Sequence, residues 1–126
     1  MRPYALAFST LLALAACTPA SNAPPPATSL TTTKGLTFVD PAGMTLYTFD
    51  KDSGGKSACN GPCAKNWPPF AASGGTASGP WTIITRDDGT QQWAYKGKPL
   101  YTWVKDAKPG DVTGDGVNQV WHVAQP

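Results

Sequence analysis

The N-terminal part of the chain is a continuous, mostly apolar run. Residues 5–16 follow a short segment with one cation, Arg2, and contain no charged residue. The run is shorter than the about 20 apolar residues that a membrane-spanning helix needs, and it has the size of the apolar part of a secretory signal peptide. We therefore predict a signal peptide over residues 1–16.

After residue 34, short apolar segments alternate with turns, which is typical of a β-rich domain. Residues 36–39 and 45–49 flank the turn Asp40-Pro41-Ala42-Gly43 and are predicted to pair as a hairpin. Further strands are predicted over residues 81–86, 92–95, 99–104 and 121–123, with turns at 87–89 and 96–97.

One short helix is predicted over residues 61–67. Pro62 suits the first helical position, Asn60 could cap the helix, and Pro68-Pro69 would end it. The fold class that follows is a mostly β, small single domain with one short helix.

The chain also repeats itself. Residues 43–52 align with residues 97–106, 54 positions later, and six of the ten aligned residues are identical. A seventh position replaces Phe49 by Trp103. In both copies, strand alternation places the tyrosine and the next aromatic residue on one face and the preceding leucine on the other. We expect two related β-hairpin repeats, around residues 35–54 and 89–108, that arose by duplication.

Composition separates a tether from a folded part. Residues 17–34 contain Pro24-Pro25-Pro26, several Thr and Ser and few large apolar residues, so we predict a flexible tether. Residues 35–126 contain all five Trp and are predicted to form the β-rich repeat domain. Ten Lys and Arg stand against eight Asp and Glu, and this near balance argues against nucleic acid as a partner.

The end of the predicted signal peptide resembles a bacterial lipobox. Leu14-Ala15-Ala16-Cys17 places small residues directly before a cysteine. The resemblance implies cleavage before Cys17 and a diacylglycerol on its sulfur, which makes the membrane a partner through a lipid anchor. Thr18 stands where an Asp retains many lipoproteins at the inner membrane. We therefore expect a periplasm-facing protein, at the outer rather than the inner membrane of a two-membrane bacterium.

Together, the lipobox, the repeated segment and Cys59-Asn60-Gly61-Pro62-Cys63 resemble the secreted-repeat lipoprotein family with the motif Tyr-x-(Phe, Trp or Tyr)-x-x-Asp. The motif residues are Tyr47, Phe49 and Asp52 in the first copy and Tyr101, Trp103 and Asp106 in the second. The resemblance implies an exported or lipid-anchored β-rich domain. It implies no activity, because the function of the family is generally given as unknown.

The motif has two interpretations. Its aromatic residues could form a stacking platform for a sugar or another planar face. Alternatively, they are buried, and Asp52 and Asp106 accept backbone N–H bonds in the turn after each strand. We prefer the structural interpretation, because a duplicated half keeps its packing more often than it keeps two copies of a site.

Cys59 and Cys63 form an even pair in an oxidising compartment, and we predict a disulfide that fixes the turn between them. The alternative is a redox-active or metal-binding thiol pair, although the spacing is not the Cys-x-x-Cys of thioredoxins.

Metal and cofactor sites find little support. His122 is the only histidine, whereas blue-copper and catalytic zinc sites use two or three. A weaker site from Met44, Cys59, Cys63 and His122 would require reduced thiols. Asp111, Thr113, Asp115 and Gly116 match the first half of a calcium loop, but His122 stands where that loop needs Glu. We predict no metal and no cofactor, and a Gly/Asp-rich turn at residues 111–116.

The sequence contains no recognisable catalytic set. The leading hypothesis is a non-catalytic protein of the bacterial envelope that is either structural or binds an envelope protein or glycan. The alternative is a periplasmic redox or metal accessory protein that uses Cys59 and Cys63.

Overall fold

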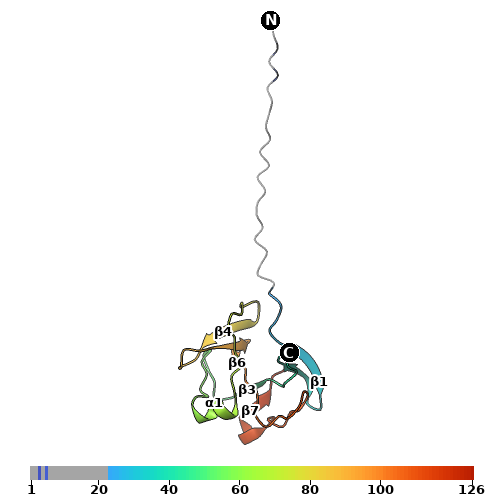
Figure 1. Cartoon of the computed structure of the whole chain (residues 1–126), viewed down its shortest axis with the longest axis vertical. Coiled ribbons are helices and arrows are strands. Elements are labelled where there is room, and N and C mark those ends of the chain that lie inside the picture. Colours follow the sequence, from blue (N-terminus) through green and yellow to red (C-terminus); the bar gives the residue numbers. More distant parts are fainter. Residues whose placement is uncertain (1–2, 4, 6–22) are drawn as a thin grey trace.

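The computed structural model describes Pro3, Ala5 and residues 23–126 (Figure 1). Cys17 and nearly all of the predicted signal peptide lie outside the described residues. The described part is mostly β, which confirms the predicted fold class: seven strands form three small antiparallel sheets, with one α-helix and one 3-10 helix.

The first sheet pairs β1 (Thr28–Thr32) with β2 (Gly35–Val39), and the second pairs β3 (Tyr47–Phe49) with β7 (Trp121–Val123). The third joins β4 (Trp81–Thr85), β5 (Gln91–Tyr95) and β6 (Lys98–Pro99). Helix α1 spans Pro62–Asn66, and the 3-10 helix η1 spans Val117–Gln119. Figure 1 shows β1 and β4 on opposite sides of the domain, with β3 and β7 between them.

Residues 28–34 were expected to belong to the tether, and the structure places them in the folded domain. Strand β1 pairs along its whole length with β2, from Thr28 opposite Val39 to Thr32 opposite Gly35. The stretch is poor in large apolar residues and reads as a linker. However, its β-branched threonines favour extended backbone, and the pairing supplies hydrogen bonds that composition does not reveal.

Residues 36–39 and 45–49 were predicted to pair as a hairpin, but the structure pairs most of the second segment with another strand. The turn forms, because Gly43 N–H donates to the Asp40 carbonyl (2.8 Å), but only an isolated bridge joins Val39 to Thr45. Strand β3 pairs with β7 instead. The second turn agrees with expectation: Lys96 (φ 49°) and Gly97 (φ 80°) are both left-handed, as a two-residue hairpin turn requires.

Two local predictions also need correction. Pro62 occupies the first turn of α1, but Gly61 is the N-cap residue and no side chain caps the helix. The predicted strand over residues 99–104 shortens to β6, because Tyr101 forms isolated bridges with Tyr47 and Pro69 instead of a long ladder.

The C-terminal segment of each repeat pairs with the other repeat. Strand β7 closes the second repeat but pairs with β3 of the first, with Tyr47 opposite Val123. In the same way, the segment after α1 closes the first repeat but lies against the second, where Pro69 bridges Tyr101. Both pairs are related by the 54-residue offset, so the two repeats form one interlocked unit.

The two copies meet at a local two-fold relationship. Tyr47 N–H donates to the Tyr101 carbonyl (2.7 Å), and Tyr101 N–H donates to the Tyr47 carbonyl (3.0 Å). Leu46 and Leu100, which precede these tyrosines, point into a different apolar cluster from the tyrosines. The structure therefore confirms the prediction that the leucine and the tyrosine of each copy lie on opposite faces of the strand.

Two apolar cores lie on the two sides of this junction. The first core gathers Ala27, Phe38, Leu46, Ala72, Trp81, Trp93, Leu100 and Ala124. The second gathers Tyr47, Cys59, Trp67, Tyr101 and Trp121. Both cores draw residues from both repeats, so neither half has a core of its own.

Candidate functional site

The motif tyrosine of each repeat hydrogen-bonds to the motif aspartate of the other repeat. The Tyr47 hydroxyl donates to Asp106 Oδ2 (2.6 Å), and the Tyr101 hydroxyl donates to Asp52 Oδ2 (2.6 Å). Both tyrosines have no exposed surface. Each tyrosine therefore uses the aspartate of the other copy as its acceptor.

The same two aspartates also order the loops that follow the motifs. Asp52 Oδ1 accepts the Ala58 N–H (2.6 Å), and Asp106 Oδ1 accepts both the N–H (3.0 Å) and the hydroxyl (2.6 Å) of Thr113. These are the backbone N–H bonds of the structural interpretation. The bonded N–H groups lie six and seven residues beyond their aspartates, further along the chain than a local turn would place them.

Burial sets the protonation of this network. Burial raises the pKa of Tyr47 and of Tyr101 above the usual value, and the hydrogen bond to a neighbouring carboxylate raises the pKa further in each case. Burial also raises the pKa of Asp52, although its hydrogen bonds and the positive charge of Arg86 act in the opposite direction. Both tyrosines are thus neutral hydrogen-bond donors at neutral pH.

Four aromatic rings stack in series beside the tyrosines. Trp67 stacks on Trp103 (3.9 Å between ring centroids) and on Trp121 (3.8 Å), and Trp121 stacks on Phe49 (4.2 Å). The two inner tryptophans are buried, whereas Phe49 and Trp103, the second motif position, are half-buried at the ends. The sequence contains a signal for this stack, because Trp67 and Trp121 also differ by 54 positions.

A depression of ≈ 380 Å³ borders the stack, lined by Phe49, Lys51, Cys63, Asn66, Trp67, Asn118, Val120 and Trp121. The inner rings cover one another, so only their edges are available to a ligand there. Nearby, Gly114 lies so close to Trp67 and Tyr47 that an added Cβ would approach their ring atoms within 2.8 and 2.9 Å. The stack is therefore packed as a core element, and the sugar-platform interpretation applies only to its two outer rings.

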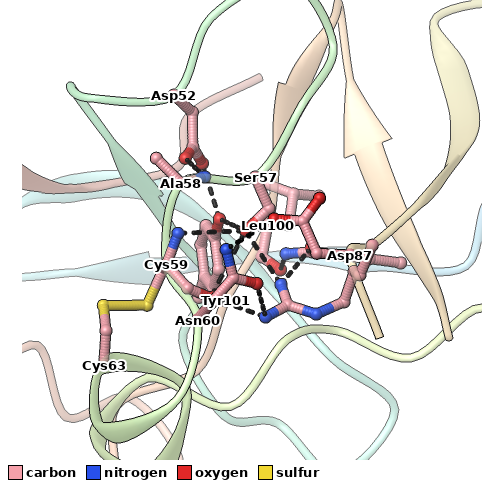
Figure 2. Close-up of a disulfide and its surroundings, with 11 residues drawn as sticks. Asp52, Ser57, Ala58, Cys59, Asn60, Cys63, Asp87, Leu100 and Tyr101 are labelled. Carbon is pink, nitrogen blue, oxygen red and sulfur yellow. Dashed lines mark hydrogen bonds between the residues drawn. A yellow bond between two sulfur atoms is a disulfide. The ribbon is translucent and has the colours of Figure 1, made fainter. Parts of the chain in front are cut away.

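The cysteine pair forms a disulfide in the structure, with Cα atoms 5.2 Å apart. Figure 2 shows this bond beside Tyr101, Ser57 and Asp52. Cys59 has no exposed surface, and Cys63 is partly buried at the start of α1. The disulfide closes residues 59–63 into a loop (the disulfide loop). Ser57, two residues before this loop, hydrogen-bonds with the Tyr101 hydroxyl (2.6 Å).

Arg86 is a buried cation that sequence reasoning missed. Its side chain is 5 % exposed and donates to Ser57 Oγ (2.9 Å), Gln92 Oε1 (2.8 Å) and the Cys59 carbonyl. Asn60, the expected helix cap, instead accepts from Arg86 and donates to Asp87 (3.2 Å). Arg86 ties β4 to the disulfide loop, and nothing in the local pattern of a strand end distinguishes it from an exposed arginine.

The residues proposed as metal ligands do not converge. Within residues 23–126, no group of three His, Cys, Asp or Glu side chains could hold a metal ion. Asp111 accepts the Ala107 N–H (2.9 Å), whereas Asp115 accepts the Val123 N–H (2.9 Å), so the two carboxylates serve separate turns. Met44 lies in the Asp40 turn.

His122 belongs to a polar groove on the other face of β3 and β7. Its Nε2 hydrogen-bonds with Asp50 Oδ2 (2.7 Å). Two depressions of ≈ 250 and ≈ 210 Å³ adjoin this pair and share Thr48, Asp50 and Lys98 as lining residues. Sequence reasoning named His122 but missed Asp50, which the β3–β7 pairing brings to it, and Lys98 of β6, which lines the same depression.

Comparison with known proteins identifies one family. A family model described as a secreted repeat of unknown function matches residues 28–71 and 82–125. The two matched segments differ by the same 54 positions as the repeat, and the first starts at β1. No curated protein and no solved structure matches the chain.

Proposed function

Because the chain belongs to a family of secreted repeats of unknown function, we propose that it is a non-catalytic binding module that a lipid on Cys17 holds to the bacterial envelope. The family match confirms the resemblance drawn from the motif. The proposal adds the anchor, the envelope location and the absence of catalysis.

The lipid anchor is supported by the lipobox at residues 14–17 and by the arrangement that follows it. The folded domain starts at Ala27, which is buried in the first core, so the Pro-rich residues 18–26 are available as a spacer. No helix within the part that the structure describes is long and apolar enough to cross a bilayer. Two or more acyl chains on one cysteine give stable attachment. Thr18 favours the outer over the inner membrane.

The non-catalytic role is supported by one observation: both tyrosines of the repeated motif are used inside the fold. Tyr47 and Tyr101 are fully buried, and their hydroxyl groups donate to Asp106 and Asp52. Such groups hold the repeats together and have no access to a substrate. The two depressions beside Asp50 and Lys98 are open at the surface and suit binding.

The experiment is an intact mass measurement of the exported protein, purified in detergent, with and without reductant and thiol alkylation. We expect the mass of a protein that begins at Cys17 and carries at least two acyl chains. We expect no thiol to be alkylated before reduction. A Cys17→Ser variant should carry no acyl chain and should not be cut before residue 17. An unacylated Cys17 in the wild-type protein would contradict the anchor.

The same experiment decides the alternative, a redox or metal accessory protein. That function requires free thiols, whereas Cys59 is fully buried in a disulfide and Cys63 is only partly exposed. Two cysteines that alkylate without reductant, or retained metal in the mass spectrum, would replace the binding module by the redox function.

A further inference from the structure

The polar groove beside β3 and β7 differs between the two repeats. In the first repeat it is lined by Thr48 and Asp50, with Lys98 and His122 from the second repeat across from them. The 54-residue offset relates these four residues to Thr102, Val104, Met44 and Pro68. Only the threonine is kept, and the acid, the base and the cation correspond to apolar residues.

The fold itself does not require the polar set. Val104, the counterpart of Asp50, is 51 % exposed and still occupies the same place in the chain: Asp50 N–H donates to Val120 (2.8 Å), and Val104 N–H donates to Asn66 (3.1 Å). The equivalent backbone hydrogen bond therefore forms beside a polar or an apolar side chain. The polar residues are an addition to one half.

Stability does not explain the addition either. The side chains of His122 and Asp50 are 47 % and 54 % exposed, and ion pairs with such exposure contribute little to folding. A hydrogen-bonded acid and base held at the rim of a depression are, however, well placed to contact a ligand.

The lining has the chemistry of a saccharide site. Asp50 and Asp52 accept hydrogen bonds, Lys98 donates them, and Thr48 and His122 can do both, which suits the hydroxyl groups of a sugar. Tyr95 adds an aromatic wall to the larger depression. Charges of both signs do not favour a strongly anionic or cationic ligand. Within the described residues the set also lacks the three ligands of a metal site.

Size agrees with this class of ligand. Volumes of ≈ 250 and ≈ 210 Å³ lie below the range of about 300–1,000 Å³ that is usual for drug-sized ligands. Each depression suits one small unit. Because they share three lining residues, two linked units could occupy both.

We propose that the groove formed by Thr48, Asp50, Lys98 and His122 binds one or two sugar units of an envelope glycan. The inference rests on the proposed function, because the location in the envelope supplies the ligand. It assigns the site to the first motif strand, its β7 partner and Lys98 of β6, and the motif residues Phe49 and Asp52 border the smaller depression.

The test is a titration of the ¹⁵N-labelled protein with di-N-acetylchitobiose, followed by NMR. We expect shifts confined to Thr48, Asp50, Lys98, His122 and their neighbours, with a Kd of roughly 1 mM, as suits a shallow site. Asp50→Ala should weaken binding about tenfold, because it removes a charged hydrogen-bond partner.

The chain offers a matched control, because Val104→Ala shortens the equivalent side chain of the other half and should leave the affinity unchanged. His122→Gln keeps a polar side chain and provides a second variant if Asp50→Ala fails to fold. Equal losses in Asp50→Ala and Val104→Ala would overturn the site. Shifts centred on Trp67 and Trp103, or no shifts at about ten times the expected Kd, would also overturn it.

The lipid anchor and the sugar site are tested independently. An acylated Cys17 without sugar binding would contradict only the proposed sugar site. Sugar binding by a protein that is not acylated would support the sugar site and contradict the lipid anchor.

Discussion

Tyr47 donates its hydroxyl hydrogen to Asp106, 59 residues further along the chain, and not to Asp52 of its own motif. Tyr101 and Asp52 form the reciprocal bond. A single copy of the Tyr-x-aromatic-x-x-Asp motif thus contains a donor and an acceptor that do not meet. The tandem arrangement supplies each with its partner.

This relationship predicts which residue pairs are coupled. In a double-mutant cycle, Tyr47→Phe and Asp106→Asn should show a coupling energy of about 1–3 kcal/mol in the free energy of unfolding, because both remove one buried hydrogen bond. Tyr47→Phe and Asp52→Asn should be close to additive. Denaturant titrations of the four proteins of each cycle measure both energies. A larger coupling within the motif than between motifs would contradict the exchange.

Alkaline pH should destabilise the protein before either buried tyrosine ionises in the folded state. Burial raises the folded-state pKa of Tyr47 and Tyr101, so the stabilisation is complete below the usual tyrosine pKa of about 10 and decreases as the pH rises toward the folded-state value. The unfolding free energy should fall by about 1.4 kcal/mol per pH unit for each tyrosine.

Absorbance of tyrosinate and circular dichroism, followed together, measure this effect. The ionisation of the two residues should coincide with loss of structure, and Tyr47→Phe should halve the slope that the pair contributes. Tyrosinate formation by Tyr47 and Tyr101 in a fully folded protein near pH 10 would be inconsistent with their burial.

The inner rings of the aromatic stack should matter more than the outer rings. Trp67→Ala should cost about 3–5 kcal/mol, because it opens a cavity between Trp103 and Trp121. Trp103→Ala should cost less, because that ring is half-buried at the end of the stack. Thermal unfolding measures both variants, and the near-ultraviolet circular dichroism of the stacked indoles should collapse only in Trp67→Ala. Equal costs would mean that the stack does not carry the packing.

A cut between the repeats should leave the fold intact. The loop of residues 73–77 joins the two matched segments and is exposed, so a protease site inserted after Thr76 should be cleaved. Because β7 and the segment after α1 are exchanged, we expect the two fragments to remain associated and folded by gel filtration and circular dichroism.

Each fragment alone should be unfolded, since both cores draw on both repeats. Two fragments that separate and stay folded would show that the repeats are independent domains. A cut within the loop of residues 87–89 lies inside the second repeat. It serves as the control, because it does not separate the two repeats from each other.

Local features of the structure followed from the sequence where neighbouring residues determine them. The Asp87–Gly89 and Lys96–Gly97 turns, strands β4, β5 and β7 and the start of α1 at Pro62 depend on turn chemistry and alternation within a few residues. The opposite orientation of Leu46 and Tyr47 depends only on the pleat of one strand.

Features that depend on a residue far along the chain could not be predicted from the sequence. Strand β1 is extended because β2 pairs with it, and the exchange of β7 is a choice between two equivalent partners that alternation cannot distinguish. Arg86 is buried because residues 57–60 offer it three acceptors. Asp50 meets His122 only through the β3–β7 register. The repeat offset contained part of this information, since it also related Trp67 to Trp121.

The exchange of closing segments has a consequence for how folding responds to dilution. A chain with one repeat would complete its cores only by meeting a second copy, so its stability would depend on protein concentration. Joining the copies by one exposed loop makes that meeting intramolecular and fixes the effective concentration of the partner. The tandem protein should thus remain folded at any dilution, without a second molecule nearby.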